Sequence, residues 1–292
     1  MSITKMTDVY PTRTGTEVKI IQRQDPVVYG KDKKGPLSVE QLDFFEKNGY
    51  LFLENYFTPQ EVEELQQEMN RMLEANRGSS ASEVILEPDG DDVRSIFAVH
   101  QSSSVFEALY KKPKLNEAAR QILGSEVYIH QSRINFKPGF AGKEFYWHSD
   151  FETWHAEDGM PRMRAFSCSI ALTDNYPFNG PLMVMPGSHQ KFVSCIGETP
   201  DDHYKHSLRK QEYGVPDHDS LTMLAEQYGI ETPVGKAGSI LLFDCNIMHG
   251  SNSNISPYPR SNIFMVFNSV ENKLTDPFAA AKPRPEFIAH RS

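Results

Sequence analysis

Hydrophobic residues in the first 126 positions recur at the three- and four-residue spacing of helices. Val39, Leu42 and Phe45 fall on one helical face, and the pair Ser38 and Gln41 has a capping-box pattern. Two further runs have similar spacing. The predicted helices are 38–49, one that begins at Thr58 with Pro59 in its first position, and 114–123.

From residue 127 onward the pattern changes to short runs rich in β-branched and aromatic residues. Turn sequences such as Asn179-Gly180-Pro181 separate these runs. The predicted strands are 127–136, 164–172, 182–185, 239–243 and 262–270, with one earlier short strand at 50–54. Helices followed by many short strands favour a mainly β fold with flanking helices: a double-stranded β-helix, or jelly-roll, cupin-like core.

The 292 residues are expected to form a single domain with three parts. An irregular N-terminal arm covers 1–36, a mostly helical support covers 37–126, and the jelly-roll core covers 127–292. A polar stretch at about 199–229, rich in His, Asp, Lys and Tyr, is expected to be an insertion in the core.

Charge and composition exclude several partners. The 30 basic and 39 acidic residues give a net charge of −9, which repels nucleic acid and anionic lipid, so neither is expected as a partner. No apolar run is long enough to span a membrane, and the polar first ten residues lack the apolar core of a signal peptide. Three cysteines without a Cys-x-x-Cys pair indicate reduced thiols, so we expect a cytoplasmic protein.

The strongest chemical signal is His148 two positions before Asp150. On a strand, residues two apart point to the same face, so both side chains can reach one metal ion. His249, at a turn after an apolar strand, is the best candidate for a third ligand. Two imidazoles and one carboxylate form a facial triad that suits Fe(II) and leaves open positions for a chelating 2-oxo acid and O2.

A His-x-Asp pair alone is a weak motif, because a surface histidine beside a solvated aspartate is a common alternative. Arg260 strengthens the prediction: it lies eleven residues after His249 (260 − 249 = 11), beyond a turn-rich segment and at the start of a strand. A guanidinium binds a carboxylate in two places, so Arg260 is our candidate for the distal carboxylate of 2-oxoglutarate. A surface arginine at a strand start is the alternative.

Other residues with ligating atoms are expected to be structural or exposed. Cys245 is expected to pack among apolar side chains, because a thiolate does not suit this ligand set. The remaining histidines considered are His130, His155, His189, His203, His206 and His218.

Longer stretches resemble a known family. The triad, Arg260 and the run PLMVMPGSH at 181–189 are similar to the phytanoyl-CoA hydroxylase-like branch of the 2-oxoglutarate dioxygenases. Within that branch, FYWHSDFETWH at 145–155 and EDGMPRMR at 157–164 resemble the signature of ectoine hydroxylases. The resemblance spans most of the chain. It implies a jelly-roll core, one Fe(2+) per chain, 2-oxoglutarate and O2 as co-substrates, ectoine as substrate, 5-hydroxyectoine, succinate and CO2 as products, and commonly a homodimer.

The resemblance also implies which residues bind each molecule. For 2-oxoglutarate it supports Lys137, Asn135, Phe264 and Arg260, and for ectoine it most strongly supports Gln131 and Trp154. Ectoine carries a delocalised cation and a carboxylate, so its pocket should combine aromatic faces with fixed polar groups. Further candidates for that pocket, chosen by strand face and position, are Arg133, Phe243, Asn262, Ser167 and Ser169.

Alternatives remain open at this stage. Trp154, Phe243 and Phe264 could equally be core residues. A related dioxygenase with another small polar substrate would keep the same triad, and a non-catalytic jelly-roll binding protein belongs to a different class. A halogenase of this fold would need a halide where Asp150 stands.

Overall fold

Antiparallel strands form three sheets in residues 7–87, 91–209 and 213–292, the part of the chain that the computed structural model describes. In chain order the strands are β1 (Ile20–Gln22), β2 (Tyr50–Leu53), β3 (Val84–Leu86), β4 (Val93–Phe97), β5 (Val127–Lys137), β6 (Phe145–His148), β7 (Ala165–Ala171), β8 (Leu182–Val184), β9 (Lys191–Val193), β10 (Ile240–Asp244), β11 (His249–Ser251) and β12 (Arg260–Ser269). The large sheet has the order β2-β10-β7-β12-β5-β4-β3, the small sheet is β6-β11-β8, and β1 pairs with β9. This architecture confirms the predicted fold class.

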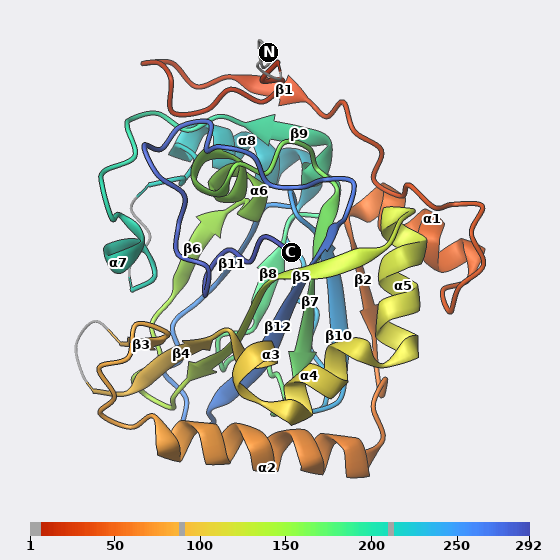
Figure 1. Cartoon of the computed structure of the whole chain (residues 1–292), viewed down its shortest axis with the longest axis vertical. Helices are drawn as coiled ribbons and strands as arrows, with labels where there is room; N and C mark the ends of the chain where they lie inside the picture. The colour runs from red at the N-terminus through yellow and green to blue at the C-terminus, as the bar shows by residue number, and fades with distance from the viewer. Residues whose placement is uncertain (1–6, 88–90, 210–212) are drawn as a thin grey trace.

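Helices cover the large sheet on one side, and Figure 1 shows α5 and α4 over its strands and α2 across one end. The α-helices are α1 (Val39–Asn48), α2 (Pro59–Ala75), α3 (Val99–Ser102), α4 (Ser104–Lys111), α5 (Pro113–Leu123), α6 (Asp150–Thr153), α7 (Tyr204–Ser207) and α8 (His218–Tyr228). A π-helical turn η1 (Trp154–Asp158) continues α6, and a 3-10 turn η2 (Ser188–Gln190) precedes β9. The predicted capping box at Ser38 starts α1, and α2 begins after Thr58 with Pro59 in its first position, as predicted; Thr58 also forms a capping box with Glu61.

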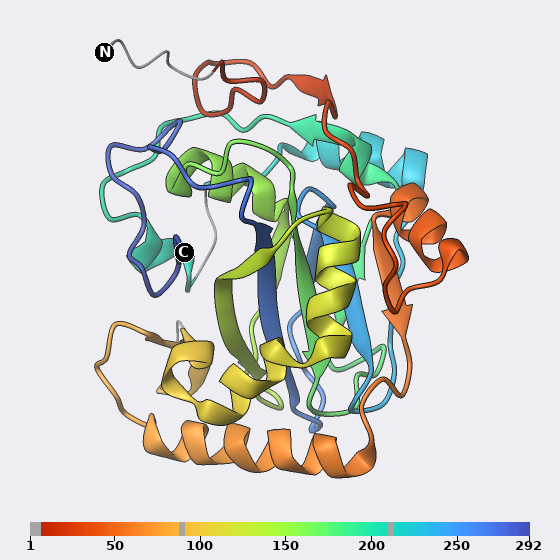
Figure 2. The ribbon, with the colours of Figure 1, turned by 45° about the vertical axis from the view of Figure 1, so that its right-hand side comes forward.

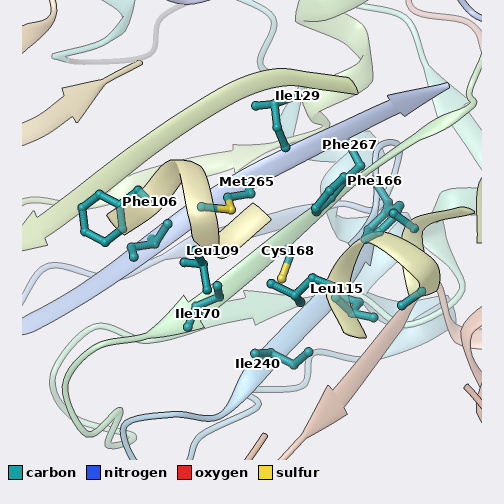
Figure 3. Packing of buried hydrophobic residues seen from close by; sticks show 14 of the residues in the cluster. Phe106, Leu109, Leu115, Ile129, Phe166, Cys168, Ile170, Ile240, Met265 and Phe267 are labelled. Atoms are coloured by element: carbon teal, nitrogen blue, oxygen red, sulfur yellow. The ribbon is translucent and has the colours of Figure 1, made fainter. Parts of the chain in front are cut away.

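The side chains of the large sheet alternate between two different environments. Met265, Cys168 and Ile170 point toward the helices and pack with residues such as Phe106 in the main hydrophobic core (Figure 3). Their sequence neighbours point to the opposite face, toward the small sheet. The helices therefore cover the apolar face, and the polar face of the same strands lines the interior of the jelly roll.

Strand register puts the inner-facing residues into rows. Across β5 and β12, Lys137 lies opposite Arg260, Asn135 opposite Asn262 and Gln131 opposite Val266. Across β12 and β7, Phe264 lies opposite Ser169 and Val266 opposite Ser167, and across β10 Ser167 lies opposite Phe243. Residues far apart in the sequence thus form one continuous inner wall.

The structure adds strands and helices to the predicted parts of the chain. The segment 37–126 carries α1 to α5, and its strands β3 and β4 extend the large sheet beyond β5. The arm at 1–36 contains β1, which pairs with β9. The insertion at 199–229 contains α7 and α8, and Leu221 and Leu224 of α8 pack against Met185 and Met248; residues 210–212 lie outside the described part.

The two ends of the described chain approach the same side of the molecule. In Figures 1 and 2 the N-terminal arm crosses the end opposite α2, close to α6. The C-terminal segment returns to β5, where the backbone N–H of His290 donates to the carbonyl of His130 (2.7 Å). Among the described helices, none has the length and apolar character needed to cross a membrane.

Candidate metal centre and adjoining pocket

Strand pairing brings the two predicted histidine ligands together. His249 lies directly opposite His148 in the antiparallel pair β11–β6, so both side chains leave the small sheet on the same face. Their ring centroids are 4.3 Å apart. The His148 Nδ1 atom lies 2.6 Å from the carbonyl oxygen of Tyr146, and the His249 Nδ1 atom lies 3.0 Å from that of Ile247. These contacts orient each ring and leave Nε2 available to a metal ion.

Asp150 lies beside the two histidines, but it belongs to a different element from the strand that we predicted. It is not on a strand: β6 ends at His148, and Asp150 is the first residue of α6. The backbone N–H of Phe151 donates to the carbonyl of Cys245 (2.8 Å), which holds the start of α6 against the segment before His249. Asp150 Oδ1 then lies 3.7 Å from His148 Nε2 and 3.9 Å from His249 Nε2.

The ligand atoms of His148, Asp150 and His249 all lie within 4.8 Å of one another, and all three side chains are buried. Burial alone would raise the pKa of Asp150, but the neighbouring His249 and His148 hold this pKa below its usual range. Burial and His148 lower the pKa of His249 to about 4. At neutral pH the site therefore presents an ionised carboxylate and a neutral His249, which is the state that binds a metal ion.

The ligand set fits Fe(II). Two imidazoles and one carboxylate on one side of an ion are typical of non-haem iron sites and leave other positions free. The Ser167 hydroxyl donates to Asp150 Oδ2 (3.2 Å) from the large sheet. The Phe243 ring lies 5.0 Å from the His249 ring. Ser167 and Phe243, both predicted to contact substrate, thus lie against the metal ligands themselves.

Two buried cations face each other across β5 and β12. The exposed fraction of Lys137 is 1% and that of Arg260 is 2%. Burial and the charge of Arg260 lower the pKa of Lys137 to about 6, and burial lowers the pKa of Arg260 to about 10. Arg260 Nε has no hydrogen-bond partner among the described residues. An unpaired buried donor in a cationic pocket is the environment that a bound carboxylate would complete.

Polar and aromatic side chains continue this wall toward the metal ligands. Asn262 donates to the Ser169 hydroxyl (2.9 Å) and accepts a long hydrogen bond from Arg260 Nη1 (3.4 Å). Asn135 accepts from the Ser95 hydroxyl (2.8 Å). Phe264 belongs to an apolar cluster with Phe243 inside the roll. Asn262 and Ser169, which we predicted as substrate contacts, therefore lie on the Arg260 side.

A separate set of predicted residues borders a cavity at the metal ligands. Gln131, Arg133 and Trp154 line this cavity together with His148 and Asp150. Arg133 Nη1 donates to the Gln131 amide oxygen (2.9 Å), and the Gln131 amide nitrogen donates to the carbonyl of Ile288 (2.9 Å). Trp154 is nearly buried, yet its indole contributes to the cavity wall, so it serves both the core and the pocket.

Sequence reasoning missed part of this cavity wall. The additional lining residues are Thr153, Glu157, His203, Ser207, Leu208, Tyr213 and Arg284. Of these, His203 was expected to be structural or exposed, but its ring packs edge-on against Tyr213 (4.7 Å) at the cavity. Arg284 forms a two-pronged ion pair with Asp158 (2.8 and 2.6 Å). Thr153 and Glu157 belong to the quoted motif runs, whereas Arg284 stands in a Pro-Arg-Pro context without a local signal.

The other competing histidines behave as expected. His155 is buried between the carbonyl of Met160 and the carboxylate of Asp8, and His189 contacts the carbonyl of Glu46. His206 and His218 are exposed. His130 packs edge-on against Trp154 (5.2 Å), and Cys245 lies in an apolar cluster.

A wider hollow of about 680 Å³ lies between α2 and the outer end of β5 and β12. Lys137 borders it, but its other walls include Met69, Leu73 and Phe136, and the metal triad lies elsewhere. The smaller cavity at the triad is therefore the candidate active site.

A jelly roll that holds a buried two-histidine, one-carboxylate triad, with the buried basic side chains of Lys137 and Arg260 on its inner wall, is typical of one class of protein, the non-haem iron, 2-oxoglutarate-dependent dioxygenases. Comparison with known proteins agrees. Residues 45–262 match the phytanoyl-CoA dioxygenase (PhyH) family. The chain therefore belongs to this family and, within it, groups with the ectoine dioxygenases.

Similarity to individual relatives extends over nearly the whole chain. An ectoine dioxygenase of Bordetella bronchiseptica is 60% identical over 285 residues, which cover 97% of this chain and 92% of the relative. An ectoine dioxygenase of Sphingopyxis alaskensis is 52% identical over 287 residues, which cover 98% and 94%. The crystal structure of EctD from S. alaskensis with 2-oxoglutarate and 5-hydroxyectoine superposes with a TM-score of 0.89 at 47% identity and covers 98% of this chain and 95% of that one.

Proposed function

We propose that this chain hydroxylates ectoine to 5-hydroxyectoine and converts 2-oxoglutarate and O2 to succinate and CO2. The observation that carries the proposal is the buried His148, Asp150 and His249 triad, formed in a chain 60% identical to an ectoine dioxygenase. Solved structures of EctD from S. alaskensis contain bound Fe in one case and 2-oxoglutarate with 5-hydroxyectoine in another, which supports both the metal and the substrate.

His148, Asp150 and His249 would hold the metal ion. When bound there, Fe(II) supplies the redox chemistry by which O2 and 2-oxoglutarate are consumed and the substrate is hydroxylated. Arg260 and Lys137 would bind the distal carboxylate of the co-substrate, and the charge of this anion would favour the protonated form of Lys137, which burial and Arg260 disfavour. Asn135, Asn262, Ser169 and Phe264 would form the wall along which the co-substrate lies.

The cavity at the triad suits a small zwitterion. Arg133 and Arg284 offer guanidinium groups to the ectoine carboxylate, and the Trp154 indole offers a π face to the delocalised cation. Gln131 is fixed by Arg133 and the Ile288 carbonyl, so its amide is pre-oriented toward the cavity. Ser167 and Phe243 would act through Asp150 and His249, which they contact. The role of these residues is to present one C–H bond to the metal centre.

Three broader expectations belong to the same proposal. We propose that residues 1–292 form a single dioxygenase domain, that two copies assemble as a homodimer, and that the enzyme works in the cytoplasm without nucleic acid or membrane partners. The net charge of −9 supports the last point. Sedimentation equilibrium should give twice the chain mass of 33.2 kDa, and a mass of one chain would contradict the dimer.

The deciding experiment is a turnover assay with anaerobically iron-loaded protein, ectoine, 2-oxoglutarate and O2. Formation of 5-hydroxyectoine and succinate in a one-to-one ratio is expected. Succinate without hydroxylated ectoine would keep the dioxygenase class but contradict the substrate, and other cyclic amino acid derivatives would then be tested. No succinate from protein with confirmed iron would point to a binding protein.

Asp150→Ala separates the enzyme from the binding protein. We expect loss of iron binding and a fall in turnover of at least about a thousandfold, because a carboxylate ligand is removed from a three-residue site. A non-catalytic binding protein would instead keep its ligand affinity in this variant. Calorimetric titration with ectoine, in parallel with succinate formation, measures both quantities.

A further inference from the structure

The nine residues of the turn at 150–158, one residue beyond β6, carry much of the candidate pocket. α6 and η1 together span residues 150–158, and Asp150, Thr153, Trp154 and Glu157 of this turn all line the cavity. A helix this short is marginal without tertiary support, and π-helical turns are intrinsically uncommon and often occur at functional sites. The position of the pocket wall therefore depends on what holds this turn from outside.

Arg13 of the N-terminal arm provides that support. Its Nε and Nη2 atoms donate to the two carboxylate oxygens of Glu152 (2.9 and 2.7 Å), and Nη1 donates to Glu157 (2.7 Å) and to the Thr199 hydroxyl (2.8 Å). Only 1% of the Arg13 side chain is exposed. Glu152 lies in α6 and Glu157 lies in η1, five residues later (157 − 152 = 5), so one guanidinium bridges the α-helical and π-helical parts of this turn.

The arm is itself held in one place. The Arg13 backbone is left-handed (φ 55°), an unfavourable conformation for a residue with a side chain, and its N–H donates to the Cys195 carbonyl (2.9 Å). The Thr12 hydroxyl donates to Glu152 (2.7 Å) and accepts from the Cys195 N–H (2.9 Å). Gly214 leaves room for the guanidinium, because a Cβ there would lie 2.7 Å from Arg13 Nη2.

The network continues to Arg284 of the C-terminal segment. Glu157 interacts electrostatically with Arg284, which pairs with Asp158 and also lines the cavity. Arg13 is not among the cavity-lining residues, so its effect on bound molecules must be indirect. It pairs with the Glu157 carboxylate on the side away from the cavity and holds the turn that carries Thr153 and Trp154.

We propose that Arg13 is a positioning residue for the substrate side of the active site, an inference that rests on the proposed function. By holding residues 150–158 from the N-terminal arm, it sets where Trp154 and Glu157 lie relative to the metal ligands. Loss of this support should misplace the substrate while the co-substrate pocket at Arg260 and Lys137, built on β5 and β12, stays intact.

The test compares wild type with Arg13→Met and Arg13→Lys. For Arg13→Met we expect the KM and the calorimetric Kd for ectoine to rise at least about tenfold. We also expect 5-hydroxyectoine formed per succinate to fall below about one half, with the Kd for 2-oxoglutarate within about twofold of wild type. Arg13→Lys keeps the positive charge but cannot donate to two carboxylates at once, so its ectoine KM and product ratio should lie between those of wild type and Arg13→Met. It replaces Arg13→Met in the test if that variant does not fold.

Arg164→Met is the matched control. Arg164 is also largely buried and ties the Leu123 carbonyl to Glu271, but its contacts are remote from the cavity. This variant should lose thermal stability and keep wild-type ectoine binding and product ratio. If the Arg13 variants fold and match wild type in the ectoine Kd and in 5-hydroxyectoine formed per succinate, Arg13 has only a structural role and the inference is overturned. The same holds if Arg164→Met lowers the product ratio as much as Arg13→Met does.

The wild-type measurements separate the inference from the proposed function. Wild-type protein that binds ectoine without hydroxylating it would contradict the proposed function alone. The role of Arg13 would then still be tested by comparing the ectoine Kd of wild type with that of the Arg13 variants. Wild-type protein that neither binds nor hydroxylates ectoine would overturn both.

Discussion

At the scale of single residues, the informative feature is a pair of buried cations rather than the metal triad. Lys137 and Arg260 lie opposite each other on β5 and β12 and are almost completely buried. Such an arrangement destabilises an empty protein, because burial and mutual repulsion both disfavour the charged forms. A dianionic co-substrate reverses this effect, and two predictions follow from the two side chains.

Arg260→Lys should weaken the co-substrate specifically. A lysine keeps the positive charge but cannot form two parallel hydrogen bonds to one carboxylate, so we expect the KM for 2-oxoglutarate to rise roughly 10- to 100-fold. Steady-state kinetics with varied 2-oxoglutarate and varied ectoine measure this. The KM for ectoine should stay within about twofold, and Arg164→Lys should change neither value. An equal rise in both KM values would remove Arg260 from the co-substrate role.

Lys137 should make the stability of the metal-free protein depend on pH. Its folded pKa of about 6 is below its ordinary value of 10.5, so between these pH values the unfolded chain binds more protons and stability rises with pH. The free energy of unfolding of wild type, relative to that of Lys137→Met, should rise by up to about 1.4 kcal/mol per pH unit from pH 6 to 9. Urea unfolding at several pH values measures this difference. Lys111→Met, at an exposed lysine, should show a constant difference from wild type; a constant difference for Lys137→Met would contradict the low pKa.

At the scale of elements, the turns between strands decide how closely the pocket walls approach. Gly180 has a left-handed backbone (φ 71°), and a Cβ there would lie 2.4 Å from the Asn252 carbonyl oxygen and 2.8 Å from Lys137 Cδ. That carbonyl accepts a hydrogen bond from Lys137 Nζ. Gly180, in the connection between β7 and β8, therefore leaves the space that the Lys137 side chain on β5 occupies. The local turn sequence around Gly180 does not predict this contact.

Gly180→Ala should consequently reduce both stability and co-substrate binding. Gly78→Ala is the matched control, because Gly78 is also left-handed (φ 65°) but a Cβ there meets nothing within 4 Å. Both variants should lose about 1 kcal/mol from backbone strain. Only Gly180→Ala should lose more and bind 2-oxoglutarate more weakly. Urea unfolding measures the stability and titration with 2-oxoglutarate measures the binding. If the two variants have the same free energy of unfolding and the same Kd for 2-oxoglutarate, the Lys137 side chain moves aside at no cost and the prediction is wrong.

At the scale of the whole molecule, both ends of the described chain complete the pocket. The arm contributes Arg13 to the turn at 150–158, and the C-terminal segment contributes Arg284 and the carbonyl of Ile288. Ile288 and Ala289 are fully buried, so this segment is part of the folded structure. The N-terminal arm therefore supports the site from outside, and the C-terminal segment forms part of its wall.

Deletion of residues 285–292 should raise the KM for ectoine about tenfold, because Gln131 loses the carbonyl that orients it. The melting temperature should also fall by several degrees as buried contacts are lost. Ile288→Ala is the control: it removes the buried side chain but keeps the backbone carbonyl, so it should melt earlier and retain the ectoine KM. A deletion variant that folds and keeps a wild-type KM would show that Gln131 is held without this segment.

Local sequence patterns determined much of this protein. The helix starts at Ser38 and Thr58 and the strand runs of the large sheet were predictable, because each depends on residues within a few positions. The metal-ligand candidates were predicted from local context, His148 and Asp150 from their spacing and His249 from its place at a turn after an apolar strand. Alternation along β5 puts Gln131, Arg133, Asn135 and Lys137 on one face. These features follow from backbone periodicity, which short-range sequence records directly.

Only the tertiary structure decided how these parts meet. Asp150 reaches the metal site from a helix start rather than a strand, because the chain turns after Ser149 against the segment before His249. Arg284 lines the site and Arg13 supports it from outside, both through long-range ion pairs that no local pattern encodes. β4 joins the sheet by pairing with β5, and β3 by pairing with β4, not through strong patterns of their own. Periodicity fixes the direction of a side chain along its own element, whereas the partner it meets depends on contacts between elements distant in the sequence.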